Sequence, residues 1–158
     1  MVKEDVNERE RKRAMKIIID ADACPVQDVV IEESAKRGKD VILVKSYAHY
    51  SNVEQEAEVI YVDPGNDSAD YKIVQLAVPG DIIITQDYGL AALALEKNCK
   101  VLHHTGFFYS KDRIDAMLFE RHQSAKRRRS KQRVRGPKPF TNEQKEHFKE
   151  QFIKELEA

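Results

Sequence analysis

Two aspartates, Asp20 and Asp22, end a short apolar run in the segment IIIDADA. More aspartates follow later apolar runs or open the next helical stretch: Asp63, Asp67, Asp70 and Asp87. A hard divalent cation such as Mg²⁺ or Mn²⁺ prefers oxygen ligands, which carboxylates supply. A loop or cap role explains any one of these aspartates equally well, but their recurrence predicts an acidic, metal-dependent site.

Repulsion between these acids supports the metal prediction. Several carboxylates within about 5 Å of one another must share protons, pair with cations or bind a metal. Few basic residues lie near them in the sequence: Lys16, Lys45 and Lys72. A bound cation can activate water and stabilise the charge that develops in phosphodiester cleavage, and Ser68 and Thr85 offer hydroxyl groups nearby. Because Asp63 precedes Pro-Gly, we favour a turn role for it.

Apolar runs of strand length alternate with stretches of helical periodicity. The predicted strands cover residues 16–20, 41–44, 58–62, 82–85 and a last segment from residue 101. The predicted helices cover residues 25–38, 66 or 67 to about 77, and 89–97. Continuous apolar strands suit a parallel sheet that is covered on both faces. The predicted fold class is therefore α/β, with a mainly parallel central sheet and helices on both faces.

On this scheme the acids converge. Asp20 and Asp22 follow the first strand, and Asp87 follows the fourth. Asp67 and Asp70 are three residues apart, so they share one face of a helix. Ligands of open α/β sheets bind in the crevice beyond the carboxyl ends of the strands, and we expect the site there.

The carboxyl-terminal part is basic and then helical. A helix is predicted over residues 114–129, and a run rich in Lys and Arg follows it. Thr141 and Gln144 match a capping box that opens a final helix. One face of this helix is apolar, through Phe148, Phe152 and Leu156. Packing against the domain is the simplest way to bury that face, and a partner subunit is the alternative.

The net charge of zero hides a strong asymmetry. Residues 15–110 contain 8 basic and 15 acidic residues, whereas residues 111–140 contain 11 basic and 3 acidic residues. An acidic site for cations beside a basic segment for phosphates suits a polyanionic substrate. The predicted nucleic-acid contacts are Arg127, Arg128, Arg129, Lys131, Arg133, Arg135 and Lys138. A solvated linker is the alternative interpretation of this segment.

Composition places the chain among cytoplasmic proteins. No apolar run approaches the roughly 20 residues of a membrane helix, and the charged N-terminus lacks a signal-peptide core. We expect free thiols and no membrane partner. We divide the chain into a flexible extension (1–14), an α/β domain (15–122), and a basic segment with a C-terminal helix (123–158). The apolar helix face and zero net charge are compatible with homo-oligomers.

Three weaker signals have structural alternatives. Cys24 stands at a helix start, but the neighbouring aspartates oppose thiolate formation, so we favour a packing thiol. His103 and His104 could bind a metal, yet no other His or Cys completes a zinc-type set. The segment SYAHYSN contains side chains that could stack on a base or pack on one another: Tyr47, His49 and Tyr50.

The motifs IDADACPV, NDSADYKIV, PGDIIITQDYGLA and RGPKPFT, in this order, resemble the YaiI/YqxD family of uncharacterised bacterial proteins. The resemblance covers nearly all of residues 15–156. That family is similar to PIN-like domains, many of which are metal-dependent ribonucleases on a parallel α/β sheet. The resemblance implies three catalytic, metal-binding acids (Asp20, Asp70 and Asp87) and two auxiliary metal ligands (Asp22 and Asp67).

Two features depart from the family pattern. Residues 1–14 precede the usual start, so Met15 is an alternative initiator to Met1. In the basic segment, Lys131-Gln132 stands where the family tends to have Gly-Gly.

The leading hypothesis is a cytoplasmic, Mg²⁺- or Mn²⁺-dependent phosphodiesterase that acts on RNA. A non-catalytic RNA-binding protein that uses the basic segment is the first alternative. The second is an aspartyl phosphatase or phosphotransferase with Asp20 as nucleophile and Asp22 as acid. That chemistry needs a lysine near the later acids, and none follows Asp87 before Lys97.

Overall fold

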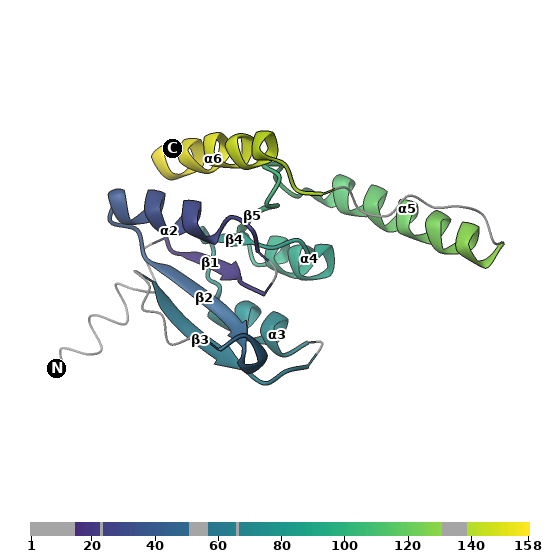
Figure 1. Cartoon of the computed structure of the whole chain (residues 1–158), viewed down its shortest axis with the longest axis horizontal. Coiled ribbons are helices and arrows are strands. Elements are labelled where there is room, and N and C mark those ends of the chain that lie inside the picture. Colours follow the sequence, from purple (N-terminus) through teal and green to yellow (C-terminus); the bar gives the residue numbers. More distant parts are fainter. Residues whose placement is uncertain (1–14, 23, 51–56, 66, 131–138) are drawn as a thin grey trace.

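The computed structural model describes residues 15–22, 24–50, 57–65, 67–130 and 139–158. Within these ranges, five parallel strands form one sheet in the order β3-β2-β1-β4-β5 (Figure 1). The strands are β1 (Ile17–Asp20), β2 (Val41–Ser46), β3 (Glu58–Val62), β4 (Ile82–Ile84) and β5 (Lys100–Leu102). The predicted strand positions and the parallel α/β class are therefore confirmed.

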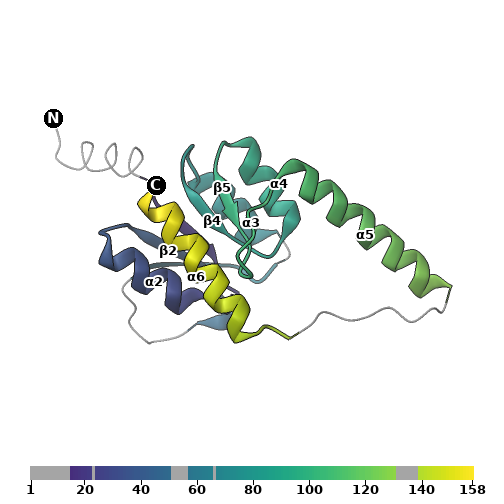
Figure 2. The same cartoon turned by 90° about the horizontal axis from the view of Figure 1, so that it is seen from above.

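Helices cover both faces of this sheet (Figures 1 and 2). Helices α2 (Gln27–Lys36) and α6 (Asn142–Glu157) pack on one face. Helices α3 (Ser68–Leu76) and α4 (Tyr88–Glu96), with the start of α5 (Lys111–Arg129), pack on the other. The rest of α5 extends away from the sheet in both views. The segment that sequence assigned to an aromatic loop contains a short 3₁₀ helix, η1 (Tyr47–His49).

The central strand explains why the sequence needs a continuous apolar run. Ile17 and Ile19 belong to the core under α2 and α6, whereas Ile18 belongs to the core under α3 and α4. All three side chains are fully buried, because successive residues of a strand point to opposite faces of the sheet. Ile18 pairs with Ile42 of β2 and Ile83 of β4, so the apolar row continues across the sheet.

Helix α6 packs on the sheet through the apolar face that we identified in its sequence. Thr141 and Gln144 form the predicted capping box. Phe148 and Phe152 are fully buried, with ring centroids 5.6 Å apart. The apolar stripe of the last helix is therefore buried within the domain.

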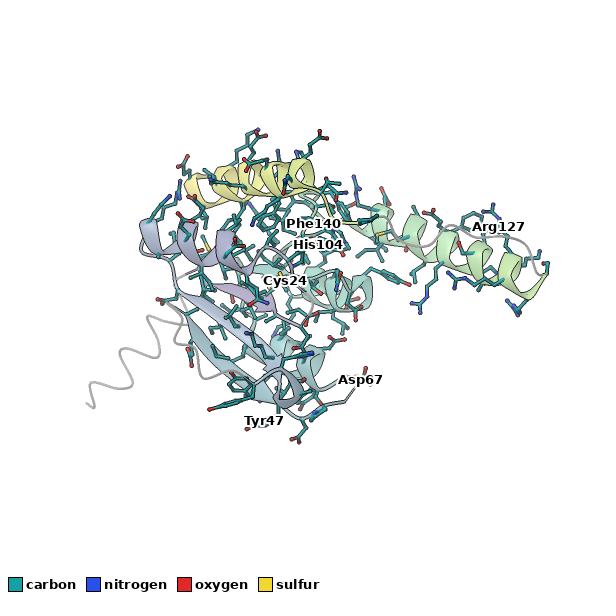
Figure 3. All side chains as sticks on the ribbon, in the orientation of Figure 1. Cys24, Tyr47, Asp67, His104, Arg127 and Phe140 are labelled. Carbon is teal, nitrogen blue, oxygen red and sulfur yellow. The ribbon has the colours of Figure 1, made fainter. Side chains whose placement is uncertain are left out.

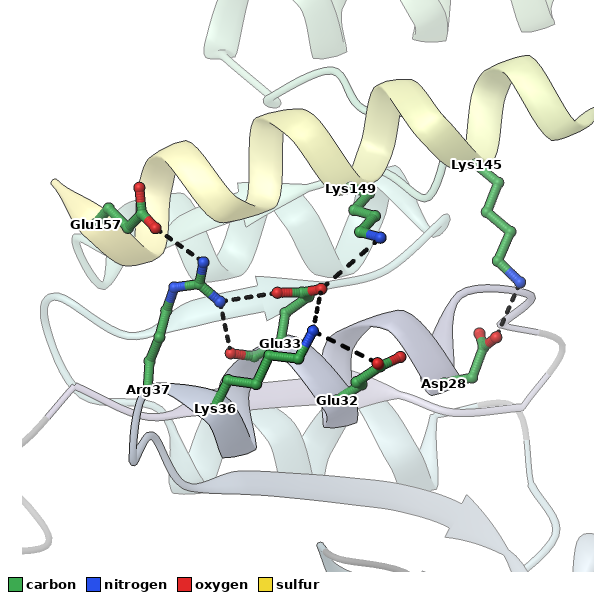
Figure 4. A network of polar contacts seen from close by, with 8 residues as sticks. All are labelled: Asp28, Glu32, Glu33, Lys36, Arg37, Lys145, Lys149 and Glu157. Atoms are coloured by element: carbon green, nitrogen blue, oxygen red, sulfur yellow. Dashed lines mark hydrogen bonds and ion pairs between the residues drawn. The ribbon is translucent and has the colours of Figure 1, made fainter.

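Ion pairs fix α6 beside α2 (Figure 4). Arg37 contacts both Glu33 of its own helix and Glu157 of α6, each at 2.8 Å. At the other end of the pair of helices, Lys145 Nζ lies 2.8 Å from Asp28 Oδ2. The two helices thus form one layer, and α6 cannot leave without exposing the core.

Other expectations meet the structure less directly. The extension 1–14 lies outside the described residues, and α5 runs without a break across the predicted domain boundary at residue 122. No helix in the described part of the chain has the length and hydropathy to cross a membrane.

Candidate functional site

The order of the strands creates a crevice at one edge of the sheet. From β1 the chain moves through β2 to β3, and then crosses to β4 and β5 on the opposite side of β1. Loops leaving the carboxyl ends of β1 and β4 therefore part, as they do at the ligand sites of open α/β sheets. A pocket of about 450 Å³ lies there. Its lining comprises Asp20, Asp22, Gly65, Ala69, Asp70, Gln86, Asp87, Tyr88 and Arg121.

The pocket brings together four of the five aspartates that we predicted as metal ligands. Asp20 ends β1 and Asp22 follows it, Asp70 lies in the first turn of α3, and Asp87 is the N-cap of α4. Asp67 is exposed at the start of α3 and does not belong to the lining. Four carboxylates from three segments that are far apart in sequence thus meet at one place.

Asp20 is a partly buried acid at the end of β1. Burial raises the pKa of its carboxyl group, the hydrogen bond from Thr85 lowers it, and the charges of Asp87 and Asp22 raise it further. Thr85 Oγ1 donates that bond to Asp20 Oδ2 over 3.0 Å. The predicted hydroxyl of Thr85 therefore serves to hold an acid in place.

Asp87 is fixed by the backbone around it. Its Oδ1 accepts hydrogen bonds from the N–H groups of Gly89 (2.8 Å) and Leu90 (3.2 Å), as an N-cap residue does. Its own N–H donates to Thr85 Oγ1. The start of α4 therefore holds Oδ1 of Asp87 in place.

Asp70 shows the unrelieved charge of the pocket most clearly. Its pKa is raised to about 6, first by desolvation and then by the negative charges of Asp87, Asp20 and Asp67 and a hydrogen bond with Asp87. Desolvation is the largest cause of this shift, and the three neighbouring carboxylates add a surplus of negative charge. A cation would relieve that surplus.

Asp22 faces the pocket and also holds a neighbouring segment. Both of its carboxylate oxygens accept from the N–H of Ser46, at 3.1 and 3.3 Å. Its Oδ1 lies 2.7 Å from Nδ1 of His49. Asp22 thus connects the pocket to η1.

Arg121 is a pocket residue that sequence reasoning missed. Its guanidinium donates to the hydroxyl of Tyr88 and lies over the ring of that residue, 5.6 Å from the centroid. Lys16, which we considered as a neutraliser, instead pairs with the buried Asp81, with Nζ 2.6 Å from Oδ2. A signal for Arg121 was present: it lies seven residues after Ile114, the buried residue of α5, and therefore on the same helix face.

The residue types of the pocket fit a hard divalent cation. Within the described ranges, no three His, Cys, Asp or Glu side chains form a ready ligand group. Four carboxylates nevertheless supply the oxygen chemistry that such a cation needs. Mg²⁺ commonly keeps several waters and binds through one or two carboxylates together with substrate phosphates, which suits an open pocket of this kind.

The predicted basic contacts that the structure describes do not belong to the pocket lining. Arg127, Arg128 and Arg129 are exposed in the last turn of α5. Figure 3 shows Arg127 toward the far end of that helix, away from Asp67 and Tyr47. The other predicted contacts, Lys131, Arg133, Arg135 and Lys138, lie outside the described residues.

Two weaker candidates have packing roles. The ring of His103 stacks on Phe107 with centroids 4.5 Å apart, and burial lowers its pKa to about 4, so it is neutral near pH 7. Burial raises the pKa of Cys24 to about 11, which favours the thiol. Both observations agree with a structural interpretation of these residues.

Comparisons with known proteins identify relatives of the chain. The sequence model of the uncharacterized YaiI/YqxD family matches residues 18–158. A UPF0178 protein of Bacillus cereus (strain AH187) is 57% identical over 140 residues, which cover 87% of this chain and 96% of the relative. UPF0178 proteins of Bacillus anthracis and of Bacillus thuringiensis subsp. konkukian are 56% identical with the same coverage. No solved structure matches the chain.

Proposed function

The chain belongs to the YaiI/YqxD family, and we propose that it is a divalent-metal-dependent phosphodiesterase that acts on RNA. One observation supports this most strongly: four aspartates from three distant segments line one pocket, and two of them have raised pKa values. The preference for RNA rests on the resemblance to PIN-like ribonucleases and on the basic end of α5.

The acids have distinct roles in this proposal. Asp20, Asp70 and Asp87 would hold Mg²⁺ or Mn²⁺, with Asp22 as an auxiliary ligand. When bound, the cation supplies water activation and stabilisation of the charge that develops in phosphodiester cleavage. Asp67 lies outside the pocket lining, and we assign it only a charge effect on Asp70.

Other side chains would hold the acids in place or attract the substrate. Thr85 holds Asp20, and the first turn of α4 holds Asp87, so two of the acids are fixed before any ligand arrives. Arg121 lines the same pocket as the acids and offers a planar set of donors to a phosphate. The exposed arginines at the end of α5 would attract the polyanion from a distance.

Calorimetric titration with Mn²⁺ is the first test. We expect saturable binding to the wild type and its loss in Asp87→Asn, which keeps the N-cap because Asn caps helices as well as Asp. The matched control is Asp63→Asn, an exposed acid at the same edge of the sheet that does not line the pocket. RNA cleavage assays with Mn²⁺ follow on the same proteins, and full cleavage by Asp87→Asn would contradict the proposal.

Non-catalytic RNA binding is the second candidate. The position of the exposed arginines, at the far end of α5 and apart from the pocket, favours it (Figure 3). RNA binding that survives neutralisation of all the pocket acids, without turnover in the wild type, would support this alternative. The phosphatase hypothesis lacks comparable support. Lys97 donates to the carbonyl of Val74, and the described pocket lining includes no lysine.

A further inference from the structure

Three tyrosines, from β3 and from η1 and its end, form a cluster of rings. Tyr47 stacks on Tyr61 of β3 with centroids 5.6 Å apart and planes 20° apart. Tyr50 also contacts Tyr61, with centroids 5.1 Å apart. We call these three residues the tyrosine platform.

The platform presents aromatic surface to solvent. Tyr47 is 56% exposed and Tyr50 is 62% exposed, although both rings are already in contact with Tyr61. Tyr61 lies on β3, which is an edge strand of the sheet in the described ranges. Ring contacts hold the rings in a defined arrangement, and their outer surface is available for stacking with another flat group.

Asp22 joins the platform to the acidic pocket. It lines the pocket, its carboxylate accepts a hydrogen bond from the N–H of Ser46, and its Oδ1 lies 2.7 Å from Nδ1 of His49. Ser46 and His49 flank Tyr47 and Ala48 in the sequence. The carboxylate thereby anchors the start and the end of η1. Arg121 of α5 also lines the pocket. A strand that occupies the pocket would therefore meet a guanidinium, and through Asp22 the pocket adjoins η1, which carries Tyr47 of the platform.

We propose that the tyrosine platform binds an unpaired base of a nucleic-acid strand whose phosphate lies in the acidic pocket. The phosphate half of this statement rests on the proposed function, whereas the base-binding half rests on the platform itself. Stacking on aromatic side chains is available to every base, because each has a π-face. A base inside a duplex has both faces covered by its neighbours, so the platform selects a strand with unpaired bases.

Fluorescence titration of a labelled oligonucleotide tests the proposal. The probe is a single-stranded RNA of about eight nucleotides with one 2-aminopurine. Its comparators are the matched blunt duplex and a strand of equal length with abasic sites. Titrations in EDTA at one fixed salt concentration prevent turnover and hold the electrostatic contribution constant. Because EDTA removes the cation that the phosphate half requires, these titrations test the base-binding half alone. We expect the full-length wild type to bind the single strand more tightly than either comparator.

Variants locate the stacking surface. The double variant Tyr47→Ala with Tyr50→Ala should bind the single strand roughly tenfold or more weakly than the wild type does. Its affinity for the abasic strand should equal that of the wild type. Tyr47→Phe with Tyr50→Phe keeps both rings and should retain wild-type affinity. Phe119→Ala is the matched control, because Phe119 is an equally exposed aromatic (65%) outside the platform. Circular dichroism melts check that every variant is folded.

Several results would overturn the inference. Equal wild-type affinity for the normal and abasic strands would exclude base stacking. A loss of affinity in Phe119→Ala as large as in the double alanine variant would show that the stacking surface is not the platform. A double alanine variant that loses self-association in size-exclusion chromatography but keeps RNA affinity would assign the platform to a second copy of the chain. The proposed function can fail independently of this inference. Stacking without Mn²⁺-dependent cleavage would contradict the proposed function but support base binding by the platform. Cleavage that does not depend on the platform would support the proposed function but contradict base binding by the platform.

Discussion

The hydroxyl of Thr85 donates a hydrogen bond to Asp20 Oδ2 over 3.0 Å. Thr85 Oγ1 in turn accepts a hydrogen bond from the backbone N–H of Asp87, also over 3.0 Å. Thr85 is only 3% exposed, so water does not compete for these bonds. One buried hydroxyl therefore links the acid that ends β1 to the acid that begins α4.

Replacing Thr85 tests this link. Thr85→Val keeps the shape but leaves the Asp87 N–H and one oxygen of Asp20 without this partner. The free energy of unfolding should fall by about 1–3 kcal/mol, and Mn²⁺ affinity should fall with it. Because the Thr85 bond lowers the pKa of Asp20, its loss should raise that pKa further. Urea denaturation and calorimetry measure both effects.

Thr85→Ser is the control for that experiment. It keeps the hydroxyl, so most of the stability and Mn²⁺ affinity should remain. A valine variant with the stability and affinity of the serine variant would contradict the role of the hydroxyl.

Two substitutions of Asp87 separate its charge from its N-cap bonds. Asp87→Asn removes the charge but keeps an acceptor for Gly89 and Leu90, whereas Asp87→Ala removes both. Only the alanine variant should lose about 1 kcal/mol of stability, since only it loses the cap. Both should lose Mn²⁺ binding. Thermal denaturation and calorimetry on the wild type and both variants check this. Mn²⁺ binding retained by the asparagine variant would show that the charge of Asp87 is not needed for the metal site.

Local patterns predicted most of the fold. The isoleucines of β1 and β4 form short continuous apolar runs, as strands of a parallel sheet covered on both faces do. Their alternation with stretches of helical periodicity identified them as strands. The apolar stripe of α6 predicted its burial because two phenylalanines on one helix face need a partner surface. The aspartates of the pocket were found because parallel strands bring their carboxyl ends to one edge.

Contacts between distant segments could not be predicted in the same way. Arg121 reaches the pocket because α5 packs against α4 at one particular angle, and sequence spacing gives only its helix face. The bond between Asp22 and His49 depends on how the chain turns after β2, in a segment without periodicity. The sequence showed Tyr61 only as one residue of a predicted strand. Its ring contacts with Tyr47 and Tyr50 are seen only in the structure.

Gly106 packs closely against α6, at His147 and Phe148. Its φ of +102° lies where side chains are disfavoured, and an added Cβ would lie 3.0 Å from the backbone nitrogen of Phe148 and overlap the ring of His147. Gly106→Ala should therefore destabilise the fold by about 1–3 kcal/mol or more. Gly38→Ala is a useful control, because its φ of +64° is also positive but no atom lies within 4 Å of the added Cβ. Urea denaturation should show the larger loss at Gly106, and equal losses would exclude the contact with α6 as the cause.

The raised pKa of Asp70 predicts an unusual pH dependence of stability. Below about pH 4 the folded and unfolded chains both hold this proton. Between about pH 4 and 6 the unfolded chain loses the proton while the folded chain keeps it, so folding stability falls as pH rises. Asp70→Asn removes this group. The variant should thus gain about 1 kcal/mol over the wild type at pH 7.5, after allowance for solvent screening, and little at pH 4.5.

Mn²⁺ should reverse that difference. A cation beside Asp70 favours the carboxylate and lowers its pKa, so saturating Mn²⁺ at pH 7.5 should stabilise the wild type more than Asp70→Asn. Urea denaturation at both pH values, with and without Mn²⁺, gives the four comparisons, and Asp63→Asn controls for the loss of one negative charge. A gain that is equal at both pH values would show that Asp70 does not retain its proton in the folded chain. A pH-dependent gain that Mn²⁺ leaves unchanged would instead remove Asp70 from the proposed ligands.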